Sequence, residues 1–267
     1  MSQLNNAMDI FKILGKTNCG ECRVPTCLAF AAAVFQGEKR LEDCPHIESG
    51  KIDRFDVNNA DSRTLDRELE KTLAKLRQRV ADVDLALSAE RIGASFADDY
   101  LTIKSLGKNF SVDSRGNVVS DCHVHGWVTV PLLTYVLSCA GAPLSGNWVP
   151  FRELKDGAAL SPLFVQRCEK PLKRVADTHT DLFDHMIDIF SAKPAPNAFD
   201  SDIAVVLSPL PSIQMLICYW KPEDDMESAL NVFFDDTAEE NLGIDALYRL
   251  AAGLAIMFEK VALTHGK

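Results

Sequence analysis

Residues 18–27 read NCGECRVPTC. Three cysteines, Cys19, Cys22 and Cys27, fall within nine residues, and a fourth, Cys44, stands directly before Pro45. Four thiols at the spacing C-x2-C-x4-C-x16-C-P can form disulfides, bind zinc, carry out dithiol chemistry or ligate an iron–sulfur cluster. Each of these would decide how residues 1–50 fold, and the rest of the chain helps to choose among them.

The composition of the 267-residue chain is that of an ordinary globular protein, with 47% apolar and 25% charged residues. A chain of this length forms one large domain or two smaller ones. The net charge of −10 argues against a general nucleic-acid binder, which needs a basic surface. It also argues against docking on anionic lipid.

The start of the chain, residues 1–16, shows no basic stretch followed by an apolar one, so we expect no secretory leader. Residues 122–151 and 203–220 carry no Asp, Glu, Lys or Arg, but prolines and polar residues interrupt both. A membrane span needs about 20 mostly apolar residues in one helix, so both stretches are predicted to be buried core. We therefore expect a cytoplasmic protein without a membrane span. Structural disulfides are rare in the cytoplasm.

The spacing of the four cysteines favours one [4Fe–4S] cluster. Structural zinc sites usually pair two C-x2-C knuckles, and this segment has one. A thioredoxin-like pair would use only Cys19 and Cys22, in a βαβ context that is missing here. Thiolates are the natural ligands of iron–sulfur clusters, and a C-x2-C-x4-C loop can surround one. Zinc, disulfide and dithiol chemistry remain as alternatives.

Cys44 can return to the same site. The alanine-rich residues 27–36 predict a helix that starts after Pro25 and Thr26 and stops at Gly37. Ten helical residues run about 15 Å away, and the seven residues before Cys44 can extend roughly 23 Å back. The sequence therefore predicts that Cys19, Cys22, Cys27 and Cys44 are the metal and cofactor ligands.

The rest of the chain predicts an α+β fold. We expect a four-cysteine cluster domain at 1–50, a linker and amphipathic helix at 51–90, and a mixed α+β domain at 91–267. The helix is predicted over 64–88, where apolar residues recur every three or four positions and share one face: Leu69, Leu73, Leu76, Val80, Val83 and Leu87. That helix either packs on its own domain or forms a homodimer. Strands are expected at 100–107, 202–207, 213–220 and 230–234 and within 110–120, where residues 114–117 form a turn. Helices are expected at 130–140, 181–190 and 244–262.

Residues 10–46 resemble a known family. The stretch KTNCGECRVPTCLAFAAAVFQGEKRLEDCP is similar to the small iron–sulfur domain of the corrinoid iron–sulfur protein large subunit and of the B subunit of Rnf electron-transport complexes. The resemblance implies a low-potential cluster that passes single electrons, for instance to an oxidised corrinoid. One departure is Arg23, where the family often has glycine after the second cysteine.

The larger domain also resembles a family, through GNWVPFREL (146–154), PLPSIQMLICYWKPEDDMESALNVFFDDTAEENLG (209–243) and MFEKV (257–261). These stretches are similar to an uncharacterised domain that follows such a cluster motif in anaerobic bacteria and archaea. The resemblance implies a common ancestry and assigns no activity.

Weaker signals lie in the larger domain. DCHVHGW (121–127) brings Cys122, His123 and His125 together, and Cys168 lies in RCE (167–169). They could bind metal, haem or a corrinoid, but a structural polar patch is the simpler interpretation. Trp148, Phe151 and Arg152 either line a cofactor pocket or form a packed turn. Cys139 and Cys218 are predicted to be buried.

Nine acidic residues and no basic one lie between Lys221 and Arg249. A solvated acidic face is the default interpretation, and a docking surface for a basic redox partner is the alternative.

The function predicted from these features is single-electron transfer by one [4Fe–4S] cluster to a partner in anaerobic, corrinoid-dependent metabolism. The partner would be a redox protein such as a corrinoid protein or its methyltransferase. Two alternatives stay open: a redox enzyme whose larger domain holds a substrate or cofactor, and a cluster-bearing binding or sensing module.

Overall fold

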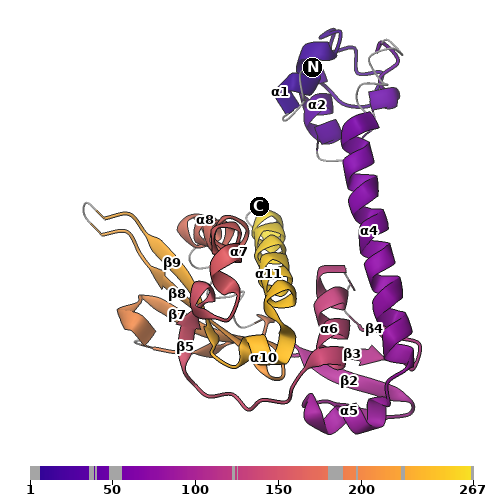
Figure 1. Ribbon diagram of the computed structural model, residues 1–267. Coiled ribbons are helices and arrows are strands. Elements are labelled where there is room, and N and C mark those ends of the chain that lie inside the picture. Colours follow the sequence, from indigo (N-terminus) through magenta and orange to yellow (C-terminus); the bar gives the residue numbers. More distant parts are fainter. Residues whose placement is uncertain are drawn as a thin grey trace. The chain divides into compact units, whose positions relative to one another are not determined.

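The computed structural model describes residues 7–35, 39, 41–47, 56–121, 124, 126–179, 189–196, 198–223 and 226–265. The chain divides into two compact units, residues 1–70 and 71–267. One helix, α4 (Asp56–Ala81), belongs to both units and is labelled in Figure 1. Helices and antiparallel sheets confirm the α+β class, while the domain boundaries at residues 50 and 90 stay a prediction.

The small unit begins with α1 (Ala7–Ile13) and α2 (Cys27–Phe35), followed by a 3-10 helix, η1 (Leu41–Asp43). α2 starts at Cys27 because the Thr26 hydroxyl accepts a hydrogen bond from the Ala29 N–H at 3.1 Å, as a helix N-cap does. The helix predicted from Cys27 is therefore confirmed over the part that the structure describes.

The helix predicted over 64–88 is two helices. α4 starts earlier, so the predicted linker is wrong from Asp56 onward, and α5 (Leu85–Arg91) follows after a break. Asp84 causes the break, because its extended backbone and its carboxylate, which accepts from the Leu87 N–H at 3.0 Å, form a new N-cap. Leu87, predicted on the buried face, is 79% exposed.

The homodimer predicted through residues 64–88 stays a prediction. Leu76 and Val80 of the predicted face are buried within this chain, while Leu69 and Leu73 are half-buried. Part of the apolar face of α4 is therefore used by the larger unit itself.

The first sheet of the larger unit has the order β1-β2-β3-β4. Its strands are β1 (Ser95–Ala97), β2 (Tyr100–Ser105), β3 (Lys108–Val112) and β4 (Val118–Val119), all antiparallel. Buried residues alternate along β2 and β3, and Ile103 pairs with Phe110. The turn predicted near residue 115 is closed by Asp113, which accepts from the N–H groups of Arg115 and Asn117 at 2.8 Å.

The second sheet has the order β5-β9-β8-β7-β6. Its long strands β7 (Ile203–Leu210), β8 (Ile213–Trp220) and β9 (Ala229–Asp235) are consecutive antiparallel neighbours and confirm three predicted strands. Its edges are short strands from elsewhere in the chain, β5 (Trp148–Pro150) and β6 (Lys193–Pro194).

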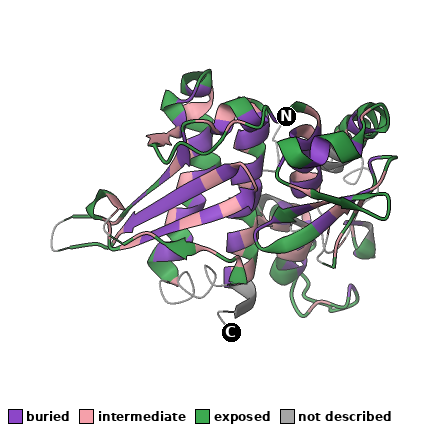
Figure 2. Cartoon of the chain, turned by 90° about the horizontal axis from the view of Figure 1, so that it is seen from below, coloured by how far each residue is buried: buried purple, intermediate pink, exposed green. Residues whose placement is uncertain are grey.

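Helices cover one face of this sheet (Figure 1), and Figure 2 shows the other face. They are α7 (Gly157–Phe164), a π-helix η3 (Val165–Glu169), α8 (Lys170–Thr178), α10 (Ala238–Leu242) and α11 (Ile244–His265). Another helix, α6 (Gly126–Ser138), packs on α10 and α11. Two 3-10 turns, η2 (Phe151–Glu153) and η4 (Ala198–Asp200), complete the list. The predicted helices at 130–140 and 244–262 are confirmed, and most of the one at 181–190 lies outside the described residues.

Strand β9 reaches beyond its short neighbour β5, and the π-helix covers part of the free edge. The Glu169 carboxylate accepts a hydrogen bond from the Val232 N–H at 3.0 Å, which satisfies an edge donor that a neighbouring strand would otherwise bind. Burial raises the pKa of Glu169, although the Val232 hydrogen bond acts in the opposite direction.

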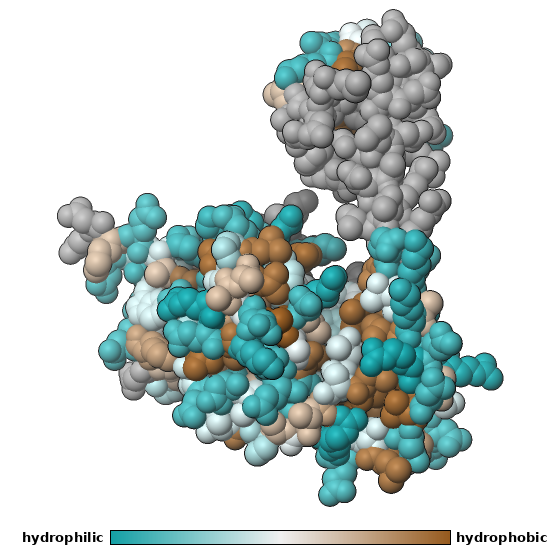
Figure 3. Space-filling view, viewed as in Figure 1, coloured by the Kyte–Doolittle hydropathy of each residue, from teal (hydrophilic) through white to brown (hydrophobic). Residues whose placement is uncertain are grey.

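Among the described residues, no helix is long and apolar enough to cross a bilayer. On the face of the larger unit seen in Figure 3, hydrophobic residues are interspersed with hydrophilic ones.

Candidate iron–sulfur site

The small unit has its own hydrophobic core, and three of the four predicted ligands lie in it. Cys22, Cys27 and Cys44 are 8–9% exposed and belong to one buried cluster. The apolar members of that cluster come from α1, the residue after it, α2 and η1: Ile10, Leu14, Phe30, Ala31 and Leu41. The sequence segments of the motif therefore meet around a common centre.

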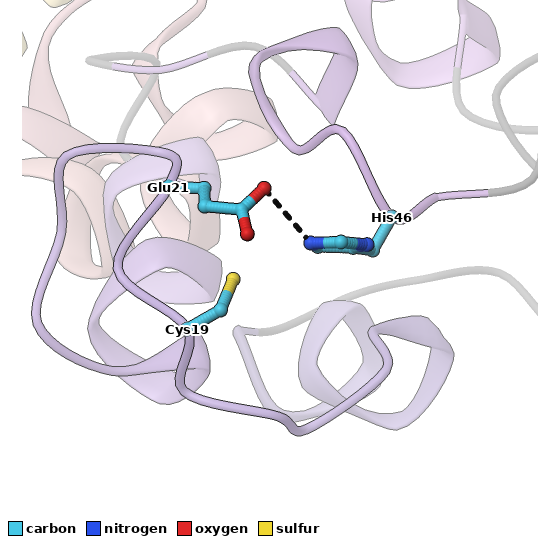
Figure 4. Close-up of side chains that lie close together, drawn as sticks. All are labelled: Cys19, Glu21 and His46. Atoms are coloured by element: carbon cyan, nitrogen blue, oxygen red, sulfur yellow. Dashed lines mark hydrogen bonds and ion pairs between the residues drawn. The ribbon is translucent and has the colours of Figure 1, made fainter.

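Cys19 differs from the other three cysteines, because it is exposed. Its Sγ atom lies within 4.8 Å of a carboxylate oxygen of Glu21 and a ring nitrogen of His46, and the Nε2 atom of His46 lies at hydrogen-bond distance, 3.0 Å, from the Oε2 atom of Glu21. Figure 4 shows the three side chains pointing toward one another. One cysteine of the motif, Cys19, is therefore exposed to solvent, and the other three are buried in the core of the small unit.

The loop before α2 reaches this arrangement through four residues in the left-handed region: Lys16, Asn18, Gly20 and Arg23, with φ between 50° and 74°. Glycine favours that region, and at Gly20 a side chain would meet no atom within 4 Å, so the backbone angle rather than space requires the glycine. Arg23 has φ 61°, an angle at which glycine would be less strained than arginine.

Asn18 joins the loop to the first residue of α2. Its side-chain oxygen accepts from the Cys27 N–H at 2.8 Å, and its own N–H donates to the Cys27 Sγ at 3.3 Å. Backbone N–H groups that point at a thiolate stabilise its negative charge, and the start of α2 adds its positive dipole end. The Cys27 sulfur therefore accepts a hydrogen bond from a backbone N–H group, as the sulfur ligands of iron–sulfur clusters often do.

The chemistry of the donor set fits an iron–sulfur cluster. The structure leaves all four of these cysteines free of disulfides, and thiolates with an apolar shell and backbone donors are typical of such clusters. Sequence reasoning missed Asn18, Glu21 and His46. Their position could have pointed to the site, because each of these three residues lies within two residues of a cysteine in the motif.

The other candidate residues do not form a second site among the described residues. Cys122, His123 and His125 lie outside the described residues. Cys168 is fully buried, its Sγ donates to the Ala251 carbonyl at 3.6 Å, and burial raises the pKa of its thiol. Cys139 and Cys218 are buried as predicted, with exposures of 2% and 0%.

The GNWVPFREL stretch forms a packed turn. Phe151 is 2% exposed and stacks on Phe164, with ring centroids 4.2 Å apart and planes at 4°. Trp148 lies half-buried in β5, and Arg152 is exposed. Phe151 and Trp148 are therefore used for packing, while Arg152 stays at the surface.

The predicted acidic face is correct for several residues and wrong for one. Glu223, Glu227, Asp236, Glu240 and Asp245 are exposed, Glu239 is half-buried, and Asp224 and Asp225 lie outside the described residues. Asp235 is 0% exposed.

Comparison with known proteins agrees with this division of the chain. Residues 14–46 match the family described as "Putative Fe-S cluster". Residues 84–257, well over half of the chain, match the family described as "Domain of unknown function (DUF3786)". The chain belongs to the DUF3786 family. The match of the DUF3786 domain begins at Asp84, the residue that starts α5.

Two curated proteins are similar to part of this chain. The acetyl-CoA decarbonylase/synthase complex subunit gamma of Methanocaldococcus jannaschii is 41% identical over 49 residues, which are 18% of this chain and 10% of that protein. The corrinoid/iron-sulfur protein large subunit of Moorella thermoacetica is 43% identical over 50 residues, 19% of this chain and 11% of that protein. This confirms the resemblance to the corrinoid iron–sulfur protein.

The chain spans about a tenth of the length of these relatives. No solved structure matches the chain. The comparisons therefore establish an iron–sulfur segment followed by a DUF3786 domain.

Proposed function

We propose that Cys19, Cys22, Cys27 and Cys44 hold one [4Fe–4S] cluster and that the protein transfers single electrons. The observation that carries the proposal is the burial of Cys22, Cys27 and Cys44 in one small core. The fourth cysteine, Cys19, is exposed and lies on the loop that also carries Cys22. When bound, such a cluster supplies one-electron redox chemistry.

The surroundings of the cysteines suit that chemistry. Hydrogen bonds to cysteine sulfur and the exposure of a cluster both influence its reduction potential. Here the Asn18 N–H donates to Cys27, the apolar residues of α1 and α2 exclude water from three ligands, and Cys19 faces solvent. We infer that a partner approaches on the Cys19 side, beside Glu21 and His46.

The names of the relatives suggest the partner. Acetyl-CoA decarbonylase/synthase subunit gamma and the corrinoid/iron-sulfur protein large subunit both favour anaerobic, corrinoid-dependent metabolism. We propose a corrinoid protein or its methyltransferase as the acceptor, in the cytoplasm, and no nucleic-acid or membrane partner. The alternatives are a redox enzyme fed by the cluster and a cluster-bearing binding or sensing module; electron uptake excludes only a module whose cluster is purely structural.

The proposal is tested by anaerobic purification with iron, sulfide and zinc analysis. We expect about four irons and four sulfides per chain, and about one electron taken up per chain on reductive titration, with an EPR signal in the reduced protein. One zinc without iron would overturn the cluster assignment, and a cluster that takes up no electron would overturn electron transfer.

Two alanine variants locate the site. Cys27→Ala removes a predicted ligand and is expected to lose most of the iron and the EPR signal. Cys218→Ala is the control, because Cys218 is also buried but lies in the larger unit, and it should keep both. Equal iron content in the two variants would contradict the assignment of the ligands.

A further inference from the structure

Two further groups that can bind a metal lie beside Cys19, the exposed cysteine of the motif. One carboxylate oxygen of Glu21 and one ring nitrogen of His46 lie within 4.8 Å of the Cys19 Sγ atom and of each other, and all three residues are exposed. Figure 4 shows them together. Within the described part of the chain, none of the three buried cysteines belongs to such a group. A substitute ligand is therefore at hand for Cys19.

The spacing of these donor atoms suits a single metal ion. Ligand atoms bound to one tetrahedral metal at about 2.0–2.3 Å are roughly 3–4 Å apart. The Nε2 atom of His46 and the Oε2 atom of Glu21 are already 3.0 Å apart. The Cys19 sulfur and the His46 nitrogen, within 4.8 Å of each other, need to approach by only about 1 Å. Either of them can therefore reach a metal at this position with a small movement.

The backbone holds His46 beside the motif whether or not Cys19 is a ligand. His46 lies two residues after Cys44, which is 8% exposed and packed in the core of the small unit. The Cys44 N–H donates to the Leu41 carbonyl at 3.0 Å, and the Ile47 N–H donates to the Cys44 carbonyl at 3.3 Å. These hydrogen bonds fix the chain on both sides of His46. Its side chain is 47% exposed, so the ring can turn without disturbing the core.

The chemistry of the two groups favours His46 over Glu21 as the substitute. Imidazole nitrogen suits iron, whereas carboxylate oxygen suits harder ions such as Mg²⁺ and Ca²⁺. In one class of [2Fe–2S] centre, two imidazoles replace two thiolates on one iron, and the reduction potential is raised. The carboxylate of Glu21, 3.0 Å from the ring, keeps the imidazole beside the motif.

We propose that His46 replaces Cys19 as the ligand of one iron when the Cys19 sulfur leaves. The proposal rests on the proposed [4Fe–4S] cluster and adds a fifth residue to its ligands. Cys19 leaves as a thiolate and an imidazole nitrogen donates its lone pair instead, so the exchange itself transfers no electron. Because a neutral ring takes the place of a negative sulfur, the exchange should raise the reduction potential. The protein then has two ligand sets with different potentials.

The first test is iron analysis of Cys19→Ala, purified anaerobically in buffer without added thiols. Cys19 lies outside the buried core of the small unit, so the variant is expected to fold, which circular dichroism checks. We expect it to keep about four irons per chain, whereas Cys27→Ala loses most of its iron. About three irons per chain in Cys19→Ala, or as little iron as in Cys27→Ala, would overturn the proposal.

Two double variants identify the substitute ligand. Cys19→Ala with His46→Ala should lose most of the iron that Cys19→Ala keeps. The matched control, Cys19→Ala with His179→Ala, removes a histidine of the larger unit and should keep that iron. Equal iron content in the two double variants would mean that another group fills the position, which contradicts the role of His46.

Spectroscopy gives a readout that a merely structural role of His46 would not change. Pulsed EPR of reduced Cys19→Ala should show a nitrogen coupling that changes on labelling with ¹⁵N-histidine and that the unmodified protein lacks. The reduction potential of this variant should be higher than that of the unmodified protein. A Cys19→Ala protein that holds its iron without a histidine coupling would refute the exchange.

Alkylation tests the exchange in the unmodified protein, where the folding of a variant is not in question. Iodoacetamide should label Cys19, located by mass spectrometry, with little loss of iron. In His46→Ala, the same labelling should release iron. No labelling of Cys19, or equal iron release from both proteins, would contradict the proposal. Unmodified protein that contains no iron at all would instead overturn the proposed cluster.

Discussion

The carboxylate of Asp235 ends strand β9 and holds a loop that lies about ninety positions earlier in the sequence. It accepts from the Gly146 N–H at 2.7 Å, from the Thr237 hydroxyl at 2.7 Å and from the Thr237 N–H at 3.1 Å. Longer contacts of 3.2–3.4 Å come from the N–H and hydroxyl of Ser145. This buried carboxylate therefore joins the segment before β5 to the end of β9.

We expect Asp235→Ala to destabilise the larger unit by about 2–4 kcal/mol. Three short hydrogen bonds to an ionised group are lost, each worth roughly 1–3 kcal/mol. Ser145 and Gly146 are exposed, so water can replace part of the loss, and the estimate stays near the lower end of the sum.

The neighbouring Asp236 provides a matched control. It also carries a carboxylate that contacts Ser145, at 2.5 Å, and the Asn147 side chain, at 3.3 Å, but it is exposed. Asp236→Ala is expected to cost about 1 kcal/mol or less. Urea unfolding followed by tryptophan fluorescence measures both variants, because all three tryptophans, Trp127, Trp148 and Trp220, lie in the larger unit.

The stabilisation that the Asp235 carboxylate provides should depend on pH. Burial tends to raise the pKa of Asp235, but hydrogen bonds from Thr237, Gly146 and Ser145 outweigh it and lower the pKa below the usual value. A carboxyl group whose pKa is lower in the folded state stabilises the fold above its unfolded pKa, about 3.9. That contribution is lost as the pH falls through the folded pKa.

The difference between the unmodified protein and Asp235→Ala should therefore be complete at neutral pH and shrink below about pH 4. Asp235 and Asp236 variants of equal stability at neutral pH, or a difference that grows in acid, would refute this account of the buried carboxylate.

Three further changes test the backbone and packing. Arg23→Gly should stabilise the loop before α2 by about 1 kcal/mol, because glycine accepts φ 61° without strain. Urea unfolding followed by the visible absorption of the proposed cluster measures this, and faster loss of that absorption in the variant would contradict it. Gly253→Ala should destabilise the larger unit by about 1–3 kcal/mol despite alanine's helix preference, since the new methyl group overlaps the Trp127 ring; an unchanged urea midpoint would show that the ring moves aside. Asp84→Ala removes the N-cap that receives the Leu87 N–H and should cost about 1 kcal/mol; no change in stability would mean that packing alone starts α5.

The sequence predicted those features that depend on neighbouring residues. The start of α2, the strands β7, β8 and β9 and the helix α11 follow from local capping or from the periodicity of apolar residues. The four-cysteine motif was equally visible, because its four cysteines lie within one short segment.

Features that depend on distant contacts could not be predicted in the same way. Trp148 pairs with Asp235 across 87 positions, so neither the strand β5 nor the burial of that carboxylate has a local signature. The break before α5 did have one, Asp84, but the regular spacing of leucines around it favoured a continuous helix. At the cluster site, the approach of His46 to Glu21 required the return of the chain after α2.

The meander β7–β8–β9 has a consequence for how the larger unit assembles. Its three long strands are joined in sequence order, so they can form before distant parts of the chain arrive, as expected for contacts of low sequence separation. The border at β9 is completed by the Glu169 carboxylate, 63 positions before Val232, and by β5, still earlier in the chain, so we expect that border to close later. Until then the open border is where another chain would add a strand, so aggregation during folding should be sensitive to substitutions at Glu169 that hardly alter the finished protein.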